Sequence, residues 1–132
     1  ILAAIALPMY GDYTARAQAT EGYELLGGMK TPLVEAVAAS SNAVACKDTA
    51  PWFAAAVKEG KYVGSVATSN ADENATTCAL TATFKAASAG VNDKVATKTI
   101  TMTLTPSSGA WACTTDLADN VAPAACRAPA KK

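Results

Sequence analysis

The chain has 132 residues, with eleven basic and eleven acidic side chains and a formal net charge of zero. This length suits a single domain with a sizeable core, and the balanced charge creates no long-range field toward nucleic acid or anionic lipid. The sequence contains no histidine, the commonest general acid or base in enzymes. The sequence therefore argues against an enzyme, and we expect no catalytic residue, cofactor or metal site.

Apolar residues open the chain and lead into a long helical pattern. Residues 1–7 are wholly apolar, and after Pro8 the chain continues with ordinary helix formers. Further along, apolar side chains recur at helical spacing and share one face: Leu25, Leu26, Met29, Leu33, Ala36 and Val37. We therefore predict one helix from Leu2 to about Ala39. Its internal prolines and glycines are points where it could kink, because proline removes a backbone donor and glycine adds chain entropy.

A connection over residues 40–61 follows this helix and contains a second, short helical pattern. Pro51 suits the first turn of a helix, and Gly60 suits the position just after its end. We therefore predict a short helix over Trp52–Glu59.

Four strand patterns occupy the rest of the chain. They alternate apolar and polar residues and cover Tyr62–Thr68, Thr77–Lys85, Lys98–Thr105 and Ala110–Thr114. Consecutive strands favour an antiparallel meander, and a sheet with one apolar face needs a cover. The apolar face of residues 25–39 is the only large one available. We therefore predict an α+β fold, with a long N-terminal α-helix packed on a four-stranded antiparallel β-sheet.

This packing leaves the first half of the long helix without a partner in its own chain. We expect a projecting segment over residues 1–24 and a globular head over residues 25–132. An exposed apolar rod implies that other molecules cover it.

The four cysteines, Cys46, Cys78, Cys113 and Cys126, are even in number and have no CxxC spacing. In a chain without histidine this pattern favours two disulfides over zinc, and hence an oxidising compartment. Four cysteines allow three pairings. The sequential one, Cys46–Cys78 with Cys113–Cys126, fits the predicted element order, and its bonds would contribute roughly 4 and 3 kcal/mol to stability.

Motifs at both ends and in the middle of the chain resemble one known family. The opening run resembles the second half of the conserved amino-terminal helix of type IVa pilins; it reads Ile1-Leu2-Ala3-Ala4-Ile5-Ala6-Leu7-Pro8-Met9-Tyr10, followed by Tyr13, Ala15, Arg16 and Ala17. The stretch Trp111-Ala112-Cys113-Thr114, with Cys126 after it, resembles the terminal disulfide-bounded loop of that family. Gly60-Lys61-Tyr62-Val63, with Cys46 and Cys78, resembles pseudomonad-type pilins that carry a second disulfide.

The resemblance implies the type IV pilin fold and the role of major structural subunit of a type IV pilus. Pilins polymerise through the N-terminal helix, so the resemblance assigns filament assembly to Ile1, Leu2, Ile5, Leu7, Pro8, Met9, Tyr10 and Tyr13. It also implies a homo-oligomeric helical filament at the cell surface, made from subunits held in the inner membrane before assembly. Adhesion, twitching motility, biofilm formation, DNA uptake and attachment of phage or host surfaces are the implied uses. The family's methylated aromatic start is not in the sequence, so we expect about four helical turns before Ile1.

Two other functions are compatible with the sequence. A minor pilin or a type II secretion pseudopilin would share the architecture, although the terminal cysteine loop favours a true pilin. A small secreted, disulfide-stabilised binding domain would be a monomer that forms no filament.

Two local charge patterns have alternative interpretations. The carboxylates of Asp72, Glu73, Asp116 and Asp119 suit calcium ligands, but solvated loop side chains are the simpler interpretation. The basic side chains of Arg127, Lys131 and Lys132 suit contacts with DNA phosphates, although charged tails are usually only solvated.

Overall fold

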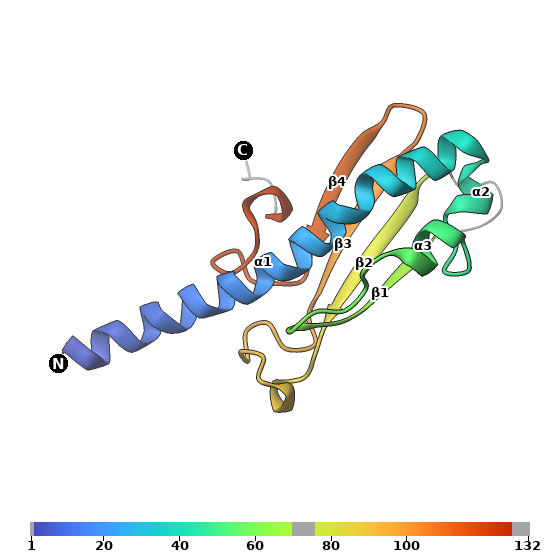
Figure 1. Ribbon diagram of the computed structural model, residues 1–132. Helices are drawn as coiled ribbons and strands as arrows, with labels where there is room; N and C mark the ends of the chain where they lie inside the picture. The colour runs from blue at the N-terminus through green and yellow to red at the C-terminus, as the bar shows by residue number, and fades with distance from the viewer. Residues whose placement is uncertain (1, 70–75, 128–132) are drawn as a thin grey trace.

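The computed structural model describes the backbone of residues 2–69 and 76–127, with the side chains of these ranges from residue 11 onward. A long helix lies along one face of an antiparallel sheet, and its N-terminal part extends beyond the sheet (Figure 1). The helices are α1 (Leu2–Ala39), α2 (Asn42–Ala45) and α3 (Pro51–Ala55), with the short 3-10 turns η1 (Ala87–Ala89) and η2 (Ala124–Cys126). The strands are β1 (Val63–Ser69), β2 (Cys78–Phe84), β3 (Thr99–Thr105) and β4 (Ala110–Thr115).

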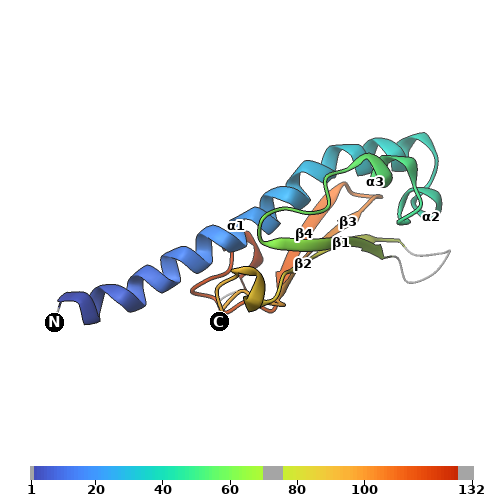
Figure 2. The same cartoon turned by 60° about the horizontal axis from the view of Figure 1, so that its bottom comes forward.

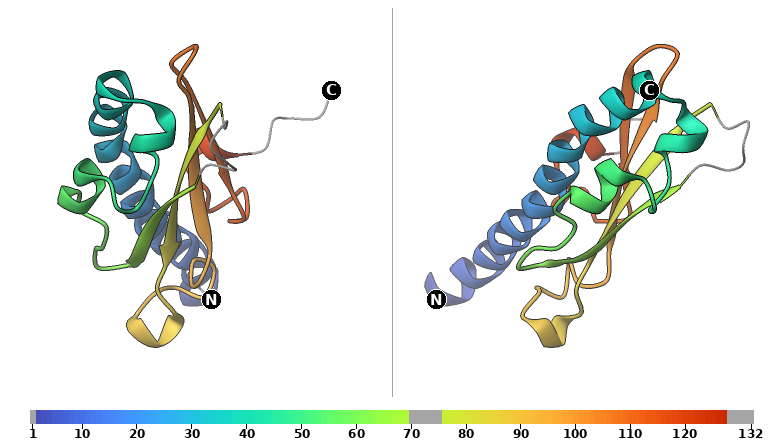
Figure 3. Two further views of the ribbon diagram at one scale, coloured as in Figure 1. Left: turned by 90° about the vertical axis from the view of Figure 1, so that its right-hand side faces the viewer. Right: turned by 45° about the vertical axis from the view of Figure 1, so that its right-hand side comes forward.

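The sheet is the predicted meander, with its strands in the order β1-β2-β3-β4 and every neighbouring pair antiparallel. Alternation along the central strands separates two faces, because successive side chains of a strand point to opposite sides. The buried face of β3 carries Ile100, Met102 and Leu104, whereas the threonines between them are only partly buried. All three helices lie on the same side of the sheet, as Figure 3 shows edge-on. The predicted α+β architecture is therefore confirmed.

Helix α1 has the bounds that the sequence predicts, and it is helical without a break from Leu2 to Ala39. None of its prolines or glycines interrupts it. Where α1 packs on the head, burial of one helical face outweighs the propensity cost of single glycines such as Gly22 and Gly27.

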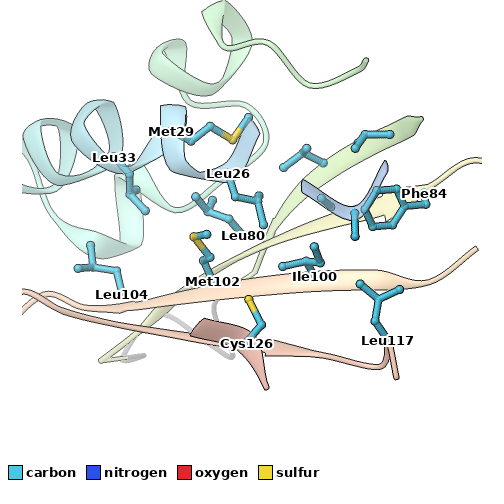
Figure 4. Packing of buried hydrophobic residues seen from close by; sticks show 14 of the residues in the cluster. Leu26, Met29, Leu33, Leu80, Phe84, Ile100, Met102, Leu104, Leu117 and Cys126 are labelled. Atoms are coloured by element: carbon cyan, nitrogen blue, oxygen red, sulfur yellow. The ribbon is translucent and has the colours of Figure 1, made fainter. Parts of the chain in front are cut away.

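The core lies between α1 and the sheet. Leu26, Met29 and Leu33 are at most 1% exposed and face the buried side chains of the central strands (Figure 4). Those partners include Leu80, Ile100, Met102 and Leu104. The apolar face predicted for residues 25–39 is thus the face that packs on the sheet.

The contact between α1 and the head begins earlier than expected. Ala15 and Ala19 are fully buried, although they precede the expected head boundary at residue 25. Gly22 lies so close to the sheet that an added Cβ would be 2.6 Å from the Cζ atom of Phe84. Hydrophobic periodicity missed this stretch because its buried residues are small. We define the leading segment as residues 2–14, the part of α1 that precedes the buried residue Ala15.

The connection between α1 and β1 differs from the sequence prediction in two ways. The predicted helix Trp52–Glu59 ends at Ala55, because the chain becomes extended at the next residue. The ammonium group of Lys58 donates to the carbonyls of Phe53 and Ala54 at 2.8 and 3.2 Å and so satisfies the end of this short helix.

Helix α2 was not predicted at all. It is a single turn whose N-cap is Ser41, and the serine hydroxyl accepts a hydrogen bond from the Val44 amide at 3.2 Å. Serine in front of a helix-forming turn is the signal that indicates it.

Two glycine substitutions test the close approach of α1 to the sheet. Gly22→Ala should lower the free energy of unfolding by about 1–3 kcal/mol, because the new methyl group overlaps the buried Phe84 ring. Gly27→Ala is the matched control, since no atom lies within 4 Å of its added Cβ. It should instead raise stability by about 0.5–1 kcal/mol, the usual gain for replacing glycine in a helix. Urea unfolding measures both; equal gains at the two positions would show that the helix does not lie this close.

Candidate assembly surface and disulfide-bounded loops

The leading segment extends α1 beyond the head, as Figures 1 and 2 show. The predicted assembly residues Leu2, Ile5, Leu7, Pro8, Met9 and Tyr10 all belong to it, and their backbone is helical. Ile1 lies outside the described residues, as do the side chains of positions 2–10. Tyr13 is the one predicted assembly residue whose side chain is described, and it is 75% exposed. Among the helices that the structure describes, none has an apolar stretch long enough to cross a membrane.

Polar side chains fasten α1 where it meets the loops of the head. The Asp12 carboxylate accepts hydrogen bonds from the Lys94 ammonium and, at 3.2 Å, from the Asn120 side-chain amide. These two hydrogen bonds, from Lys94 above all, hold the pKa of Asp12 below its usual range. One turn further on, the Nε atom of Arg16 donates to the carbonyl of Asn120 at 2.5 Å. Two loops far apart in sequence are therefore tied to one turn of the helix.

Two further ties follow along α1, the first to the loop that also contains Lys94 and the second to the connection before β1. The buried Gln18 side chain accepts a hydrogen bond from the Asn92 amide at 2.7 Å. The Glu21 carboxylate accepts hydrogen bonds from the amides of Tyr62 and Val63 at 3.0 and 3.2 Å, at the point where the chain enters β1. Sequence reasoning missed all four of these helix residues, because their partners lie between 41 and 108 positions away.

Both disulfides have the predicted sequential pairing. Cys46, which ends α2, is bonded to Cys78 at the start of β2, with a Cα–Cα distance of 5.8 Å. Cys113 of β4 is bonded to Cys126 of η2, with a Cα–Cα distance of 4.6 Å. The first bond therefore fixes the connection after α1 to one end of β2, and the second fixes the C-terminal loop to the edge strand β4.

The loop closed by Cys113 and Cys126 has an apolar inside and a polar outside. Leu117, Val121 and Ala122 are buried in the core, whereas Asp119 and Asn120 are exposed. The disulfide and this apolar anchor together fasten the loop to the head on both sides of its exposed part.

The alternative sites proposed from charge patterns find no support in the described part of the chain. No group of three or more His, Cys, Asp or Glu side chains there could hold a metal ion. Asp116 instead accepts a hydrogen bond from the Thr99 amide at 2.8 Å, which joins the end of β4 to the start of β3. Arg127 donates to the carbonyl of Ala122 at 3.1 Å. Asp72, Glu73, Lys131 and Lys132 lie outside the described residues.

Removing each disulfide tests its contribution to the head. Replacing both Cys46 and Cys78 with Ala should lower the free energy of unfolding by about 4 kcal/mol, and replacing Cys113 and Cys126 by about 3 kcal/mol, because the first bond closes the longer loop. Denaturant unfolding gives these values. As a control, thiol titration of the unfolded, unreduced parent should find no free thiol, and two or more reactive thiols would contradict the pairing.

Comparisons with known proteins agree with this geometry. Residues 15–127 match the family described as pilin, a bacterial filament protein. The chain is 40% identical over 129 residues to the fimbrial protein EcpC of Eikenella corrodens, covering 96% of this chain and 80% of that protein. It is 32% identical over 115 residues to a fimbrial protein of Neisseria meningitidis, covering 86% of this chain and 62% of the relative.

A third relative is the type IV major pilin protein PilE1 of Neisseria gonorrhoeae, with 33% identity over 117 residues. The alignment covers 86% of this chain and 50% of that relative, so this chain corresponds to half of PilE1. Pilins are structural rather than enzymatic proteins. The matched residues take in the whole described sheet and both disulfides. This chain belongs to the type IV pilin family.

Proposed function

We propose that this chain is the major structural subunit of a type IV pilus and that it polymerises through the leading segment of α1. One observation carries the proposal: α1 is buried against the head from Ala15 onward, whereas the same helix continues past the head before that point (Figure 1). The sequence of this part opens with an unbroken apolar run. Such a rod needs partners, and copies of the same chain can provide them.

The energetics of that arrangement favour a filament. Burying one large apolar side chain between subunits is worth roughly 1.5–3 kcal/mol. When the rod of one copy contacts a different surface of the next, the interface is heterologous, and the assembly remains open as a helical filament unless the rotation closes it. The name of the gonococcal relative supports a major rather than a minor subunit.

The head would be the outward part of this filament. Its loops, above all the one closed by Cys113 and Cys126, would form the surface that meets the surroundings. In this proposal the unassembled subunit waits in the inner membrane, and the pilus acts at the cell surface. Adhesion, twitching motility, biofilm formation and contacts with phage or DNA would then be properties of the filament.

A charge in the leading segment tests the proposal. In the natural full-length protein, Ile5→Asp should abolish surface pili, because an unpaired charge is costly in a dry helix bundle. Electron microscopy of cells and recovery of sheared pili measure the effect, and immunoblots of the membrane fraction confirm that the subunit is made. Val44→Asp, the same change at a side chain of α2 that is 58% exposed, should leave piliation intact.

The stability of the head separates assembly from folding. The purified Ile5→Asp protein should unfold at the same temperature as the parent, since position 5 precedes Ala15, the first buried residue among the described side chains of α1. Normal pili on the Ile5→Asp cells, or loss of head stability, would contradict the proposal.

A further inference from the structure

An apolar groove runs along the head between α1 and α3, which lie side by side (Figure 2). Its volume is about 390 Å³. We call it the α1–α3 groove, and its lining residues are Glu24, Leu25, Gly28, Met29, Pro32, Trp52, Ala55, Ala56 and Val57. Eight of these nine side chains are apolar or, for glycine, absent. The groove therefore offers a surface for an apolar occupant.

The structure keeps this surface apolar. The only N–H group of the Trp52 ring is already used, since it donates to the carbonyl of Ala45 at 2.6 Å. Val57 stands at the rim and is 66% exposed, which is unusual for so large an aliphatic side chain in the described head. The one charged residue of the lining is Glu24, and no basic group forms an ion pair with it among the described residues.

The same chain carries a surface complementary to this groove. Tyr13 is the most exposed large hydrophobic side chain in the described residues, and it lies on α1 before the helix enters the core. Arg16 is one turn away and also exposed, so the two residues lie on the same side of the helix. The Nε atom of Arg16 already donates to the carbonyl of Asn120, but a guanidinium has four further N–H donors. This pair thus presents an aromatic ring beside a positive charge, opposite in sign to Glu24.

Tyr13 cannot fill the groove of its own molecule. Glu24 is the nearest lining residue on α1, and it lies eleven positions further along the same continuous helix. At the helical rise this is about 16 Å, which is longer than a tyrosine side chain. A Tyr13 side chain that fills the groove would therefore belong to another copy of the chain.

We propose that the α1–α3 groove receives the Tyr13 face of a second copy of this chain, with Arg16 of that copy directed toward Glu24. The inference rests on the proposed function and deepens it, because it names the head surface on which the helix of a neighbouring subunit lies. Each copy presents one groove and one Tyr13 face, at different places on its surface, so the contact is heterologous and can repeat without closing. The apolar contact provides most of the affinity, and the opposite charges fix the orientation.

Disulfide trapping in assembled pili tests this contact. The natural full-length protein would carry Tyr13→Cys together with Val57→Cys, and pili sheared from cells would be oxidised mildly and separated without reducing agent. The native cysteines do not compete, because all four are already bonded. We expect a ladder of covalent dimers, trimers and longer chains, since every subunit gives one bond and receives one.

Matched controls use a side chain of similar exposure away from the groove. Tyr13→Cys paired with Val44→Cys should give no ladder, because Val44 lies on α2 outside the lining. Each single substitution should leave monomers. Pili that form normally but give no ladder with positions 13 and 57, or an equal ladder with positions 13 and 44, would overturn the inference while leaving the proposed function intact. Absence of pili from the unmodified parent would instead refute the proposed function.

A second variant covers the case in which the double substitution prevents assembly. Benzoylphenylalanine in place of Val57, with Tyr13 unchanged, allows photo-crosslinking in pili made with mixed subunits. The crosslink should map to the tryptic peptide of another subunit that ends at Arg16. A crosslink that maps to any other peptide would overturn the inference.

Discussion

The packing of one narrow stripe of α1 on the sheet is the constraint on which the rest of the structure depends. Its buried members change in size along the helix, from Ala15, Ala19 and Gly22 near the entry to Leu26, Met29 and Leu33 over the centre of the sheet. Small residues let the helix backbone approach the ring of Phe84 closely, and large ones fill the wider space between helix and strands. This taper sets both how α1 lies on the sheet and how much of α1 remains for other contacts.

That division of α1 connects folding to assembly. Side chains on the buried stripe serve the head, and the ties from Asp12, Gln18 and Glu21 hold three separate loops around the helix. The leading segment, with Tyr13 near its end, continues past the head, and the α1–α3 groove lies further along the same helix, so both are surfaces open to other contacts. A pilin needs such a division, because its subunit must be stable alone and still present apolar surface to its neighbours.

Much of this fold was predictable because its signals are local. The bounds of α1, the four strands and their order follow from apolar periodicity and turn residues, and sequential cysteine pairing fits that order. The features that were missed depend on distant partners. From the sequence, Gly22 is a weak point of the helix, whereas in the structure it allows the helix to pack closely on Phe84. The early end of α3 depends on Lys58, whose ammonium group donates to the carbonyl of Phe53. The α1–α3 groove could not be predicted either, since it exists only once two helices from different parts of the chain lie side by side.

Removal of residues 1–14 tests most directly the claim that the core packing of α1 on the head begins at Ala15. The shortened chain keeps every residue of α1 that is buried among the described side chains, and it loses the hydrogen bonds that Asp12 accepts at the surface. We predict a soluble monomer by analytical ultracentrifugation that unfolds cooperatively in urea, with a free energy of unfolding within about 1 kcal/mol of the longer chain. A shortened chain that is unfolded, or that loses several kcal/mol, would place the leading segment in the core of the head and contradict the account.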